Sequence, residues 1–203
     1  MKNYFLVTLA LVLPTLLFCQ EDYTITINGK KMDVALDKEF TTTINGKSTV
    51  LKVNIKDTLS YSDAFFNFKY PSDFKISKIQ VEQGIEQLTI MSAEGSGIII
   101  QRYNTINPKF LNEMMMNEVT KESVNYGYDL VRKDYDRKLK NGVNLQVAKA
   151  VLTYEEDVNT YEIASHGFKD SGVLIMTMTM NEESKEQGEK IIKMLWDTLE
   201  IKI

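Results

Sequence analysis

Few side chains in this chain are suited to nucleophilic or metal chemistry. The 203 residues include one histidine, His166, and one cysteine, Cys19. Most metal sites and most nucleophile–base pairs need at least two such side chains from different parts of a chain. Ser165 precedes His166 in an alternating segment, where neighbouring residues point to opposite faces of a strand. The sequence therefore predicts no catalytic residue, no bound metal and no cofactor.

Carboxylates supply the alternative hypothesis, which is an enzyme. Asp134 and Asp136 are two residues apart, so a strand would place them on one face, and Glu155–Asp157 is an acidic cluster. Two carboxylates can divide the acid and base roles of a hydrolase, and a cluster can gather Ca²⁺. Arg132 and Arg137 are near enough to pair with the aspartates instead, and acids in turns are commonly solvated. A carboxylate-based periplasmic hydrolase therefore stays open as the alternative.

Aromatic residues supply a candidate binding surface. The energy of a protein interface concentrates in a few residues, and aromatic anchors are common among them. Phe65 and Phe66 are adjacent, so a strand would place one on each face. The candidate ligand or partner surface consists of those side chains that the fold leaves exposed among Phe65, Phe66, Tyr70, Phe74 and Tyr103.

The composition is that of an ordinary globular domain and limits the possible partners. The chain is 43% hydrophobic and 26% charged, with a formal net charge of −4. An acidic chain has no overall attraction for a phosphate backbone, which argues against nucleic acid as a partner. The expected partner is an unknown protein or small ligand in the cell envelope.

The N-terminus has the pattern of an export signal. Lys2 precedes a mostly apolar stretch, Phe5–Phe18, which is too short to cross a bilayer comfortably and ends at Gln20. We expect residues 1–19 to be removed and the mature chain, without a transmembrane helix, to be periplasmic or extracellular. The ending Leu17–Gln20 resembles exported proteins of the Bacteroidetes.

Cys19 leaves a second outcome open for the mature N-terminus. Lipoprotein signals normally carry a small residue just before the lipidated cysteine, and Phe18 stands there instead. This favours cleavage after Cys19, with Gln20 as the first mature residue. Membrane anchoring would follow only if Cys19 is lipidated.

The rest of the chain is predicted to alternate between runs of strands and two helices. Asn28-Gly29, Asn45-Gly46 and Asn141-Gly142 are expected as two-residue hairpin turns. Val173–Met180 is expected as a central strand. One helix follows Asn107-Pro108 and buries Phe110, Leu111, Met114, Met115 and Val119. The other is capped by Asn181 and buries Ile191, Ile192, Leu195 and Leu199.

This order indicates an α+β fold, in which two main helices flank an antiparallel sheet. We expect residues 20–60 to form an N-terminal β-hairpin extension and residues 61–203 to form the α+β domain.

Three stretches carry a resemblance to a known family: Phe66–Phe74, Asn141–Val143 with the paired strands after it, and the ending from Gly172–Met176 through the last helix to Trp196–Ile201. On these stretches, residues 65–203 resemble the PsbP-like fold, which is shared with Mog-like and DcrB-like proteins, and the ending is most similar in style to DcrB-like proteins. Members of this fold are mostly binding or accessory proteins with unrelated partners, and they share no catalytic residues. The resemblance therefore implies a binding or accessory role but does not identify the partner. The expected function is therefore an exported, non-catalytic binding or accessory protein that acts through a sheet face or a sheet–helix groove.

Overall fold

The computed structural model describes residues 23–180 and 185–202. The expected signal peptide, Cys19 and the expected helix cap Asn181 lie outside the described residues. The chain divides into two compact units between Ile55 and Lys56. The expected boundary, between residues 60 and 61, falls inside strand β5 (Thr58–Ser62), which pairs with β6 (Phe66–Pro71) of the second unit.

The first unit consists of two β-hairpins. Their strands are β1 (Tyr23–Ile27), β2 (Lys30–Val34), β3 (Glu39–Ile44) and β4 (Lys47–Lys52). Asn28 and Gly29 have φ of 50° and 81°, and Asn45 and Gly46 have φ of 51° and 79°. Positive φ at both central residues is the type I′ turn that the Asn-Gly pairs predict.

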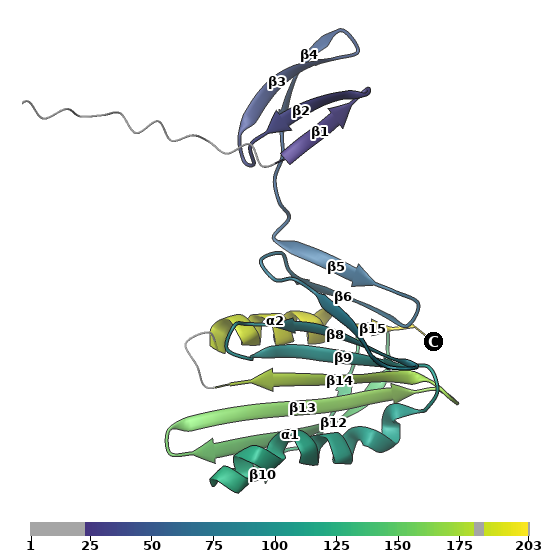
Figure 1. Ribbon diagram of the computed structural model, residues 1–203, viewed down its shortest axis with the longest axis vertical. Helices are drawn as coiled ribbons and strands as arrows, with labels where there is room; N and C mark the ends of the chain where they lie inside the picture. Colours follow the sequence, from purple (N-terminus) through teal and green to yellow (C-terminus); the bar gives the residue numbers. More distant parts are fainter. Residues whose placement is uncertain (1–22, 181–184, 203) are drawn as a thin grey trace, which may run out of the picture. The chain divides into compact units, whose positions relative to one another are not determined.

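The second unit contains a large antiparallel sheet (Figure 1). Along its main path the order is β10-β12-β13-β14-β9-β8-β7, and β11 pairs with β12. Strand β14, which contains most of the expected central strand, does lie in the middle. The bounds are β7 (Ser77–Glu82), β8 (Ile85–Met91), β9 (Gly97–Tyr103), β10 (Asp129–Arg132), β11 (Tyr135–Lys138), β12 (Asn144–Tyr154), β13 (Asp157–Gly167) and β14 (Gly172–Thr179).

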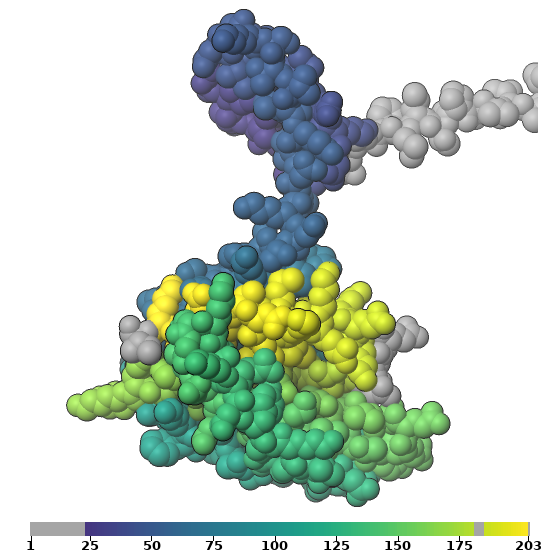
Figure 2. Space-filling model, turned by 180° about the vertical axis from the view of Figure 1, so that it is seen from behind, coloured from purple at the N-terminus to yellow at the C-terminus, as the bar shows by residue number. Residues whose placement is uncertain are grey.

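The two helices cover opposite faces of this sheet, which confirms the α+β class (Figure 1). Helix α1 (Asn112–Tyr126), preceded by the 3₁₀ helix η1 (Pro108–Leu111), packs on β12 and β13. Helix α2 (Lys185–Thr198) packs on β9, β14 and β6. A smaller sheet, with the order β15-β6-β5, is completed by β15 (Glu200–Ile201). Seen from behind, α2 in yellow lies beside the green part of the second unit (Figure 2).

The almost continuously apolar sequence of strand β14 is explained by its burial on both faces. Val173 and Ile175 are buried in the core beneath α2, whereas Leu174 and Met176 are buried in the core beneath α1. A strand covered on both faces has no need of alternating polar residues. No helix of the described residues has the length and apolar character needed to cross a membrane.

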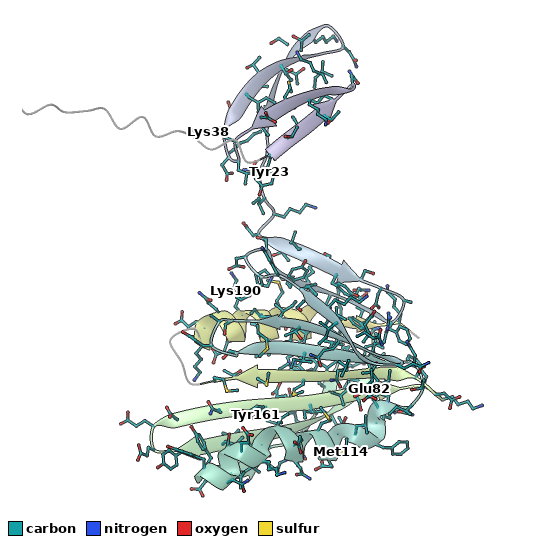
Figure 3. The ribbon with its side chains drawn as sticks, in the orientation of Figure 1. Tyr23, Lys38, Glu82, Met114, Tyr161 and Lys190 are labelled. Atoms are coloured by element: carbon teal, nitrogen blue, oxygen red, sulfur yellow. The ribbon has the colours of Figure 1, made fainter. Side chains whose placement is uncertain are left out.

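The prediction for the buried face of α1 is partly wrong. Phe110 is 85% exposed and Met114, labelled in Figure 3, is 57% exposed, whereas Met116 and Thr120 are buried. Residues 108–111 form a 3₁₀ turn, which has fewer residues per turn than an α-helix. The apolar positions counted from Pro108 therefore do not stay on the face of α1 that meets the sheet. Thr120 satisfies its buried hydroxyl by donating to the Met116 carbonyl at 2.8 Å.

The prediction for the Asn141-Gly142 turn is also corrected. Gly142 has φ of 90°, but Asn141 does not have positive φ. The Gly142 N–H donates to the Leu139 carbonyl at 2.9 Å, and the Leu139 N–H donates to Val143 at 2.8 Å. This is a three-residue loop ending in a left-handed glycine. The Asn141 side chain donates to the Ile201 carbonyl at 2.7 Å and so ties the loop to β15.

Candidate functional site

Of the five aromatic residues from which a binding surface was expected to be drawn, two are buried and three are half-buried. Phe66 and Tyr103 are 0% and 4% exposed, so neither belongs to a surface. Phe65, Tyr70 and Phe74 are half-buried and pack against the core beneath α2. Phe66 is covered because β6 lies between β5 and β15, a pairing that joins residues far apart in sequence. Only Phe65, Tyr70 and Phe74 of this set reach solvent, each in part.

The carboxylates of the hydrolase hypothesis do not form an acid–base pair. Asp134 and Asp136 line one surface depression together with Glu113. Burial would raise the pKa of Asp134, but hydrogen bonds from Arg132 and the Lys149 N–H outweigh it, and the pKa lies below its ordinary value. The Arg132 hydrogen bond likewise lowers the pKa of Glu113. A general acid needs the opposite shift, because it must hold a proton near neutral pH.

The acidic cluster Glu155–Asp157 lies elsewhere, at the turn between β12 and β13. Asp134 accepts a hydrogen bond from the backbone N–H of Lys149, which is six residues before Glu155 (155 minus 149). Six extended residues span about 20 Å, so these acids cannot act on one bond. In the part of the chain that the structure describes, no three His, Cys, Asp or Glu side chains gather as a possible metal site.

His166 is half-buried, and its ring meets Phe168 edge-on with centroids 5.3 Å apart. Burial, and then the positive charge of Lys109, lower the pKa of His166 below its ordinary value. The imidazole is therefore neutral at pH 7, beside an aromatic ring.

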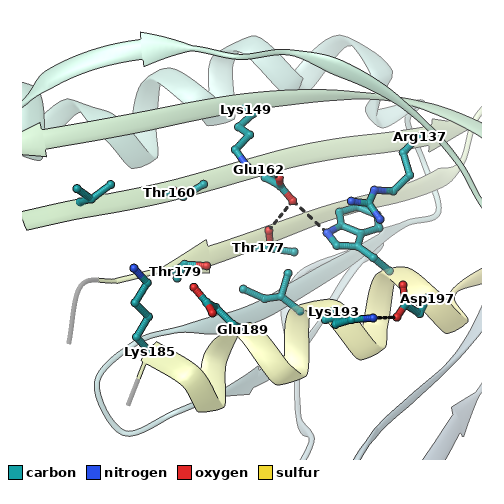
Figure 4. Close-up of a pocket in the computed structure, with 13 residues that line it drawn as sticks. Arg137, Lys149, Thr160, Glu162, Thr177, Thr179, Lys185, Glu189, Lys193 and Asp197 are labelled. Atoms are coloured by element: carbon teal, nitrogen blue, oxygen red, sulfur yellow. Dashed lines mark hydrogen bonds and ion pairs between the residues drawn. The ribbon is translucent and has the colours of Figure 1, made fainter. Parts of the chain in front are cut away.

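The structure instead brings a polar cluster together in a groove between α2 and the sheet, called here the α2 groove (Figure 4). Its volume is about 410 Å³. The floor comes from β13 and β14, one wall from β11 and β12, and the other wall from α2. The lining residues are Arg137, Lys149, Val158, Thr160, Glu162, Thr177, Thr179, Lys185, Glu189, Ile192, Lys193, Trp196 and Asp197.

Glu162 is the central residue of the α2 groove. It is 7% exposed, and its two oxygens accept four hydrogen bonds. Oε1 accepts from the Tyr135 hydroxyl at 3.1 Å and from Lys149 Nζ at 3.0 Å. Oε2 accepts from Trp196 Nε1 at 3.1 Å and from the Thr177 hydroxyl at 3.4 Å. The donors come from β11, β12, α2 and β14, so one carboxylate joins four elements.

The strand register explains why this charge is tolerated in a buried position. Glu162 lies opposite Lys149 on β12 and opposite Thr177 on β14. An isolated buried carboxylate is costly, and hydrogen bonds with a paired cation offset that cost. The sequence analysis missed this site. The available signal was a glutamate between Tyr161 and Ile163, two residues that are buried in the other core.

Arg137 lies beside this network and is held by aromatic rings. Its guanidinium carbon is 4.8 Å from the centre of the Trp196 ring and 5.4 Å from that of Tyr135. Its Nη2 donates to the Tyr135 hydroxyl at 3.0 Å. Burial raises the pKa of Tyr135, so the hydroxyl keeps its proton and donates a hydrogen bond to Glu162.

The other end of the α2 groove is lined by threonines and by charged residues of α2. Thr160 and Thr179 are direct cross-strand partners on the floor. Lys185 and Glu189 line the α2 wall beside them, whereas the ion pair between Lys193 and Asp197 lies toward the Trp196 end (Figure 4). The groove thus combines fixed charges of both signs with hydroxyl groups.

Comparisons with known proteins give likenesses of structure only. No protein-family model matches the chain, and no curated protein matches it significantly. The solution structure of cyanobacterial PsbP (CyanoP) from Synechocystis sp. PCC 6803 has a TM-score of 0.45 and 11% identity, covering 74% of this chain and 95% of that one. A crystal structure from Bacteroides thetaiotaomicron VPI-5482 has a TM-score of 0.33 and 17% identity, covering 71% of this chain and 48% of that one. These values carry no inference about ligand, partner or activity.

Proposed function

We propose that this protein is an exported, non-catalytic binding or accessory protein that holds a ligand or a partner segment in the α2 groove. The observation that carries the proposal is the environment of Glu162. Its two oxygens accept four hydrogen bonds, which fix the position of the charge and of the side chains around it. A small number of precisely held polar groups in a concave site is typical of ligand recognition.

The same environment argues against a catalytic role for Glu162. A catalytic carboxylate must reach the reacting atom within hydrogen-bond distance and exchange a proton with it. Glu162 is engaged on both oxygens, and Asp134 and Glu113 are held as carboxylates by Arg132. Binding is therefore the function that the groove supports best. Asp134 of the hydrolase hypothesis is held as a carboxylate by Arg132, and the Glu155–Asp157 cluster lies too far from it to act on the same bond.

Export is proposed from the N-terminal sequence. Lys2, the apolar stretch Phe5–Phe18 and the polar residues from Gln20 support it. The ligand or partner would then be a component of the cell envelope.

Native mass spectrometry tests the groove proposal. The mature chain is incubated with a small-molecule extract of the cell envelope, and the mass of any bound component is recorded. Thr179→Phe places a phenyl ring on the groove floor and should abolish binding of the component. Thr153→Phe makes the same change at an exposed position of β12 that does not line the groove, and should leave binding intact. A bound mass retained in Thr179→Phe, or absent from the wild-type protein, would contradict the proposal.

A further inference from the structure

The three arginines of the chain are held in two different ways. Arg102 pairs with Asp63 and Glu86, at 3.5 and 2.7 Å. Arg132 pairs with Glu113 and Asp134, at 3.0 and 2.8 Å. Arg137 forms no ion pair within residues 23–180 and 185–202, although it lies in a groove that contains three carboxylates.

Those three carboxylates include two that already have cation partners. Lys149 pairs with Glu162 at 3.0 Å, and Lys193 pairs with Asp197. The remaining charged residues of the lining are Arg137, Lys185 and Glu189. The charges of the two ion pairs cancel. The end of the groove beside Trp196 therefore carries the uncompensated positive charge of Arg137.

The guanidinium is also positioned in advance. The guanidinium carbon lies over the Trp196 and Tyr135 rings, and Nη2 donates one hydrogen bond to the Tyr135 hydroxyl. Nε is buried without a hydrogen-bond partner among the described residues, which is an arrangement that costs free energy. The remaining N–H groups of Nη1 and Nη2 have no partner in the described part of the chain. A planar group of this kind matches the two oxygens of a carboxylate or phosphate.

We propose that Arg137 is the anchor for an anionic oxygen group, a carboxylate or a phosphate, of the ligand in the α2 groove. This inference rests on the proposed function of the groove. Charge-assisted hydrogen bonds from Nη1 and Nη2 hold the group against the Trp196 end. Lys185, at the start of α2, adds to the attraction at the other end, and Thr160 and Thr179 offer hydroxyls between them.

Trp196 is the sole tryptophan of the chain, so its indole N–H gives one resonance in a ¹⁵N–¹H spectrum. The experiment titrates the mature protein with sodium phosphate and, separately, with sodium acetate, at constant ionic strength maintained with sodium chloride. Each anion that the site accepts should shift this resonance saturably, while chloride alone should not. A shift with phosphate alone identifies the ligand group as a phosphate, and a shift with acetate alone identifies it as a carboxylate. A shift with both anions shows that the site recognises the oxyanion chemistry that the two groups share.

Three variants make the assignment specific. Arg137→Gln should weaken the apparent affinity at least about tenfold, because it removes the charge and most of the donors. Arg137→Lys should weaken it about threefold or more, because a lysine keeps the charge but loses the planar geometry. Lys138→Gln removes a charge from the next, exposed residue of β11 and should bind as the wild type does.

The inference is overturned if Arg137→Gln titrates as the wild type does, if chloride gives the same shift, or if neither anion shifts Trp196. A different result would overturn the proposed function of the groove. An envelope component that binds Arg137→Gln normally but is lost from Thr179→Phe leaves the groove function intact and removes only the role of Arg137. A component that Thr179→Phe binds normally removes the groove function itself.

Discussion

Trp196 Nε1 donates a hydrogen bond to Glu162 Oε2 at 3.1 Å and so links α2 to β13 across the groove. Both residues are buried, and they are 34 positions apart in the sequence. The bond fixes the helix to the polar centre of the sheet face. Both the shape of the groove and the stability of the second unit should therefore depend on Glu162.

Replacing Glu162 should destabilise the protein strongly. Glu162→Ala removes the acceptor shared by Lys149, Tyr135, Trp196 and Thr177. The free energy of unfolding should fall by about 2–4 kcal/mol. The loss is smaller than for a fully buried ion pair because Lys149 is partly solvated. Urea denaturation followed by Trp196 fluorescence measures this. Glu189→Ala, an exposed change on the same groove, should stay within about 0.5 kcal/mol. Equal stability of the two variants would show that the network around Glu162 is not structural.

The Arg132 cluster should make part of the stability depend on acid pH. The pKa values of Glu113 and Asp134 lie below their ordinary values of 4.5 and 3.8. Carboxylates with a lowered folded-state pKa stabilise the protein above the unfolded-state pKa, and this contribution is lost as the pH falls through the folded-state pKa. The stability difference between the wild type and Arg132→Gln should therefore be largest near neutral pH and shrink below about pH 4. A difference that is constant from pH 7 to pH 3, measured by urea denaturation, would contradict it.

Gly142 should be needed for its backbone conformation alone. A Cβ at this position would meet nothing within 4 Å, so any cost of substitution comes from φ of 90°. Gly142→Val should lower the free energy of unfolding by about 1–2 kcal/mol, and Gly142→Asn by less, because asparagine tolerates the left-handed region. Thermal unfolding of the two variants gives the order, and a valine variant as stable as the asparagine variant would exclude this explanation.

The mature N-terminus is predicted to be Gln20. Phe18 is too large for the position before a lipidated cysteine, so cleavage after Cys19 is expected. Intact-mass measurement of the exported protein distinguishes the outcomes. A mass that begins at Cys19 and carries added acyl groups would show a lipoprotein.

Local signals in the sequence predicted the local features of the fold. The two Asn-Gly turns of the first unit follow from the positive φ that these residues tolerate. The central place of β14 follows from its continuous apolar run. The same Asn-Gly signal gave the wrong loop length at residue 142, because a two-residue and a three-residue loop can both end in glycine.

The groove was not predictable by such rules, because its residues meet only through long-range pairing. Arg137, Glu162 and Trp196 come from β11, β13 and α2, and only the register of β12 with its neighbours brings the first two together. The burial of Phe66 likewise depends on β15 at the far end of the chain. A single sequence gives no measure of these pairings.

The most direct test of groove binding is the indole resonance of Trp196 during titration with an envelope component that the mature protein binds. The account predicts a saturable shift in the wild type and in Thr153→Phe, and loss of both binding and shift in Thr179→Phe. A component that binds the wild-type protein while the Trp196 resonance stays unmoved would place the site elsewhere and contradict the account.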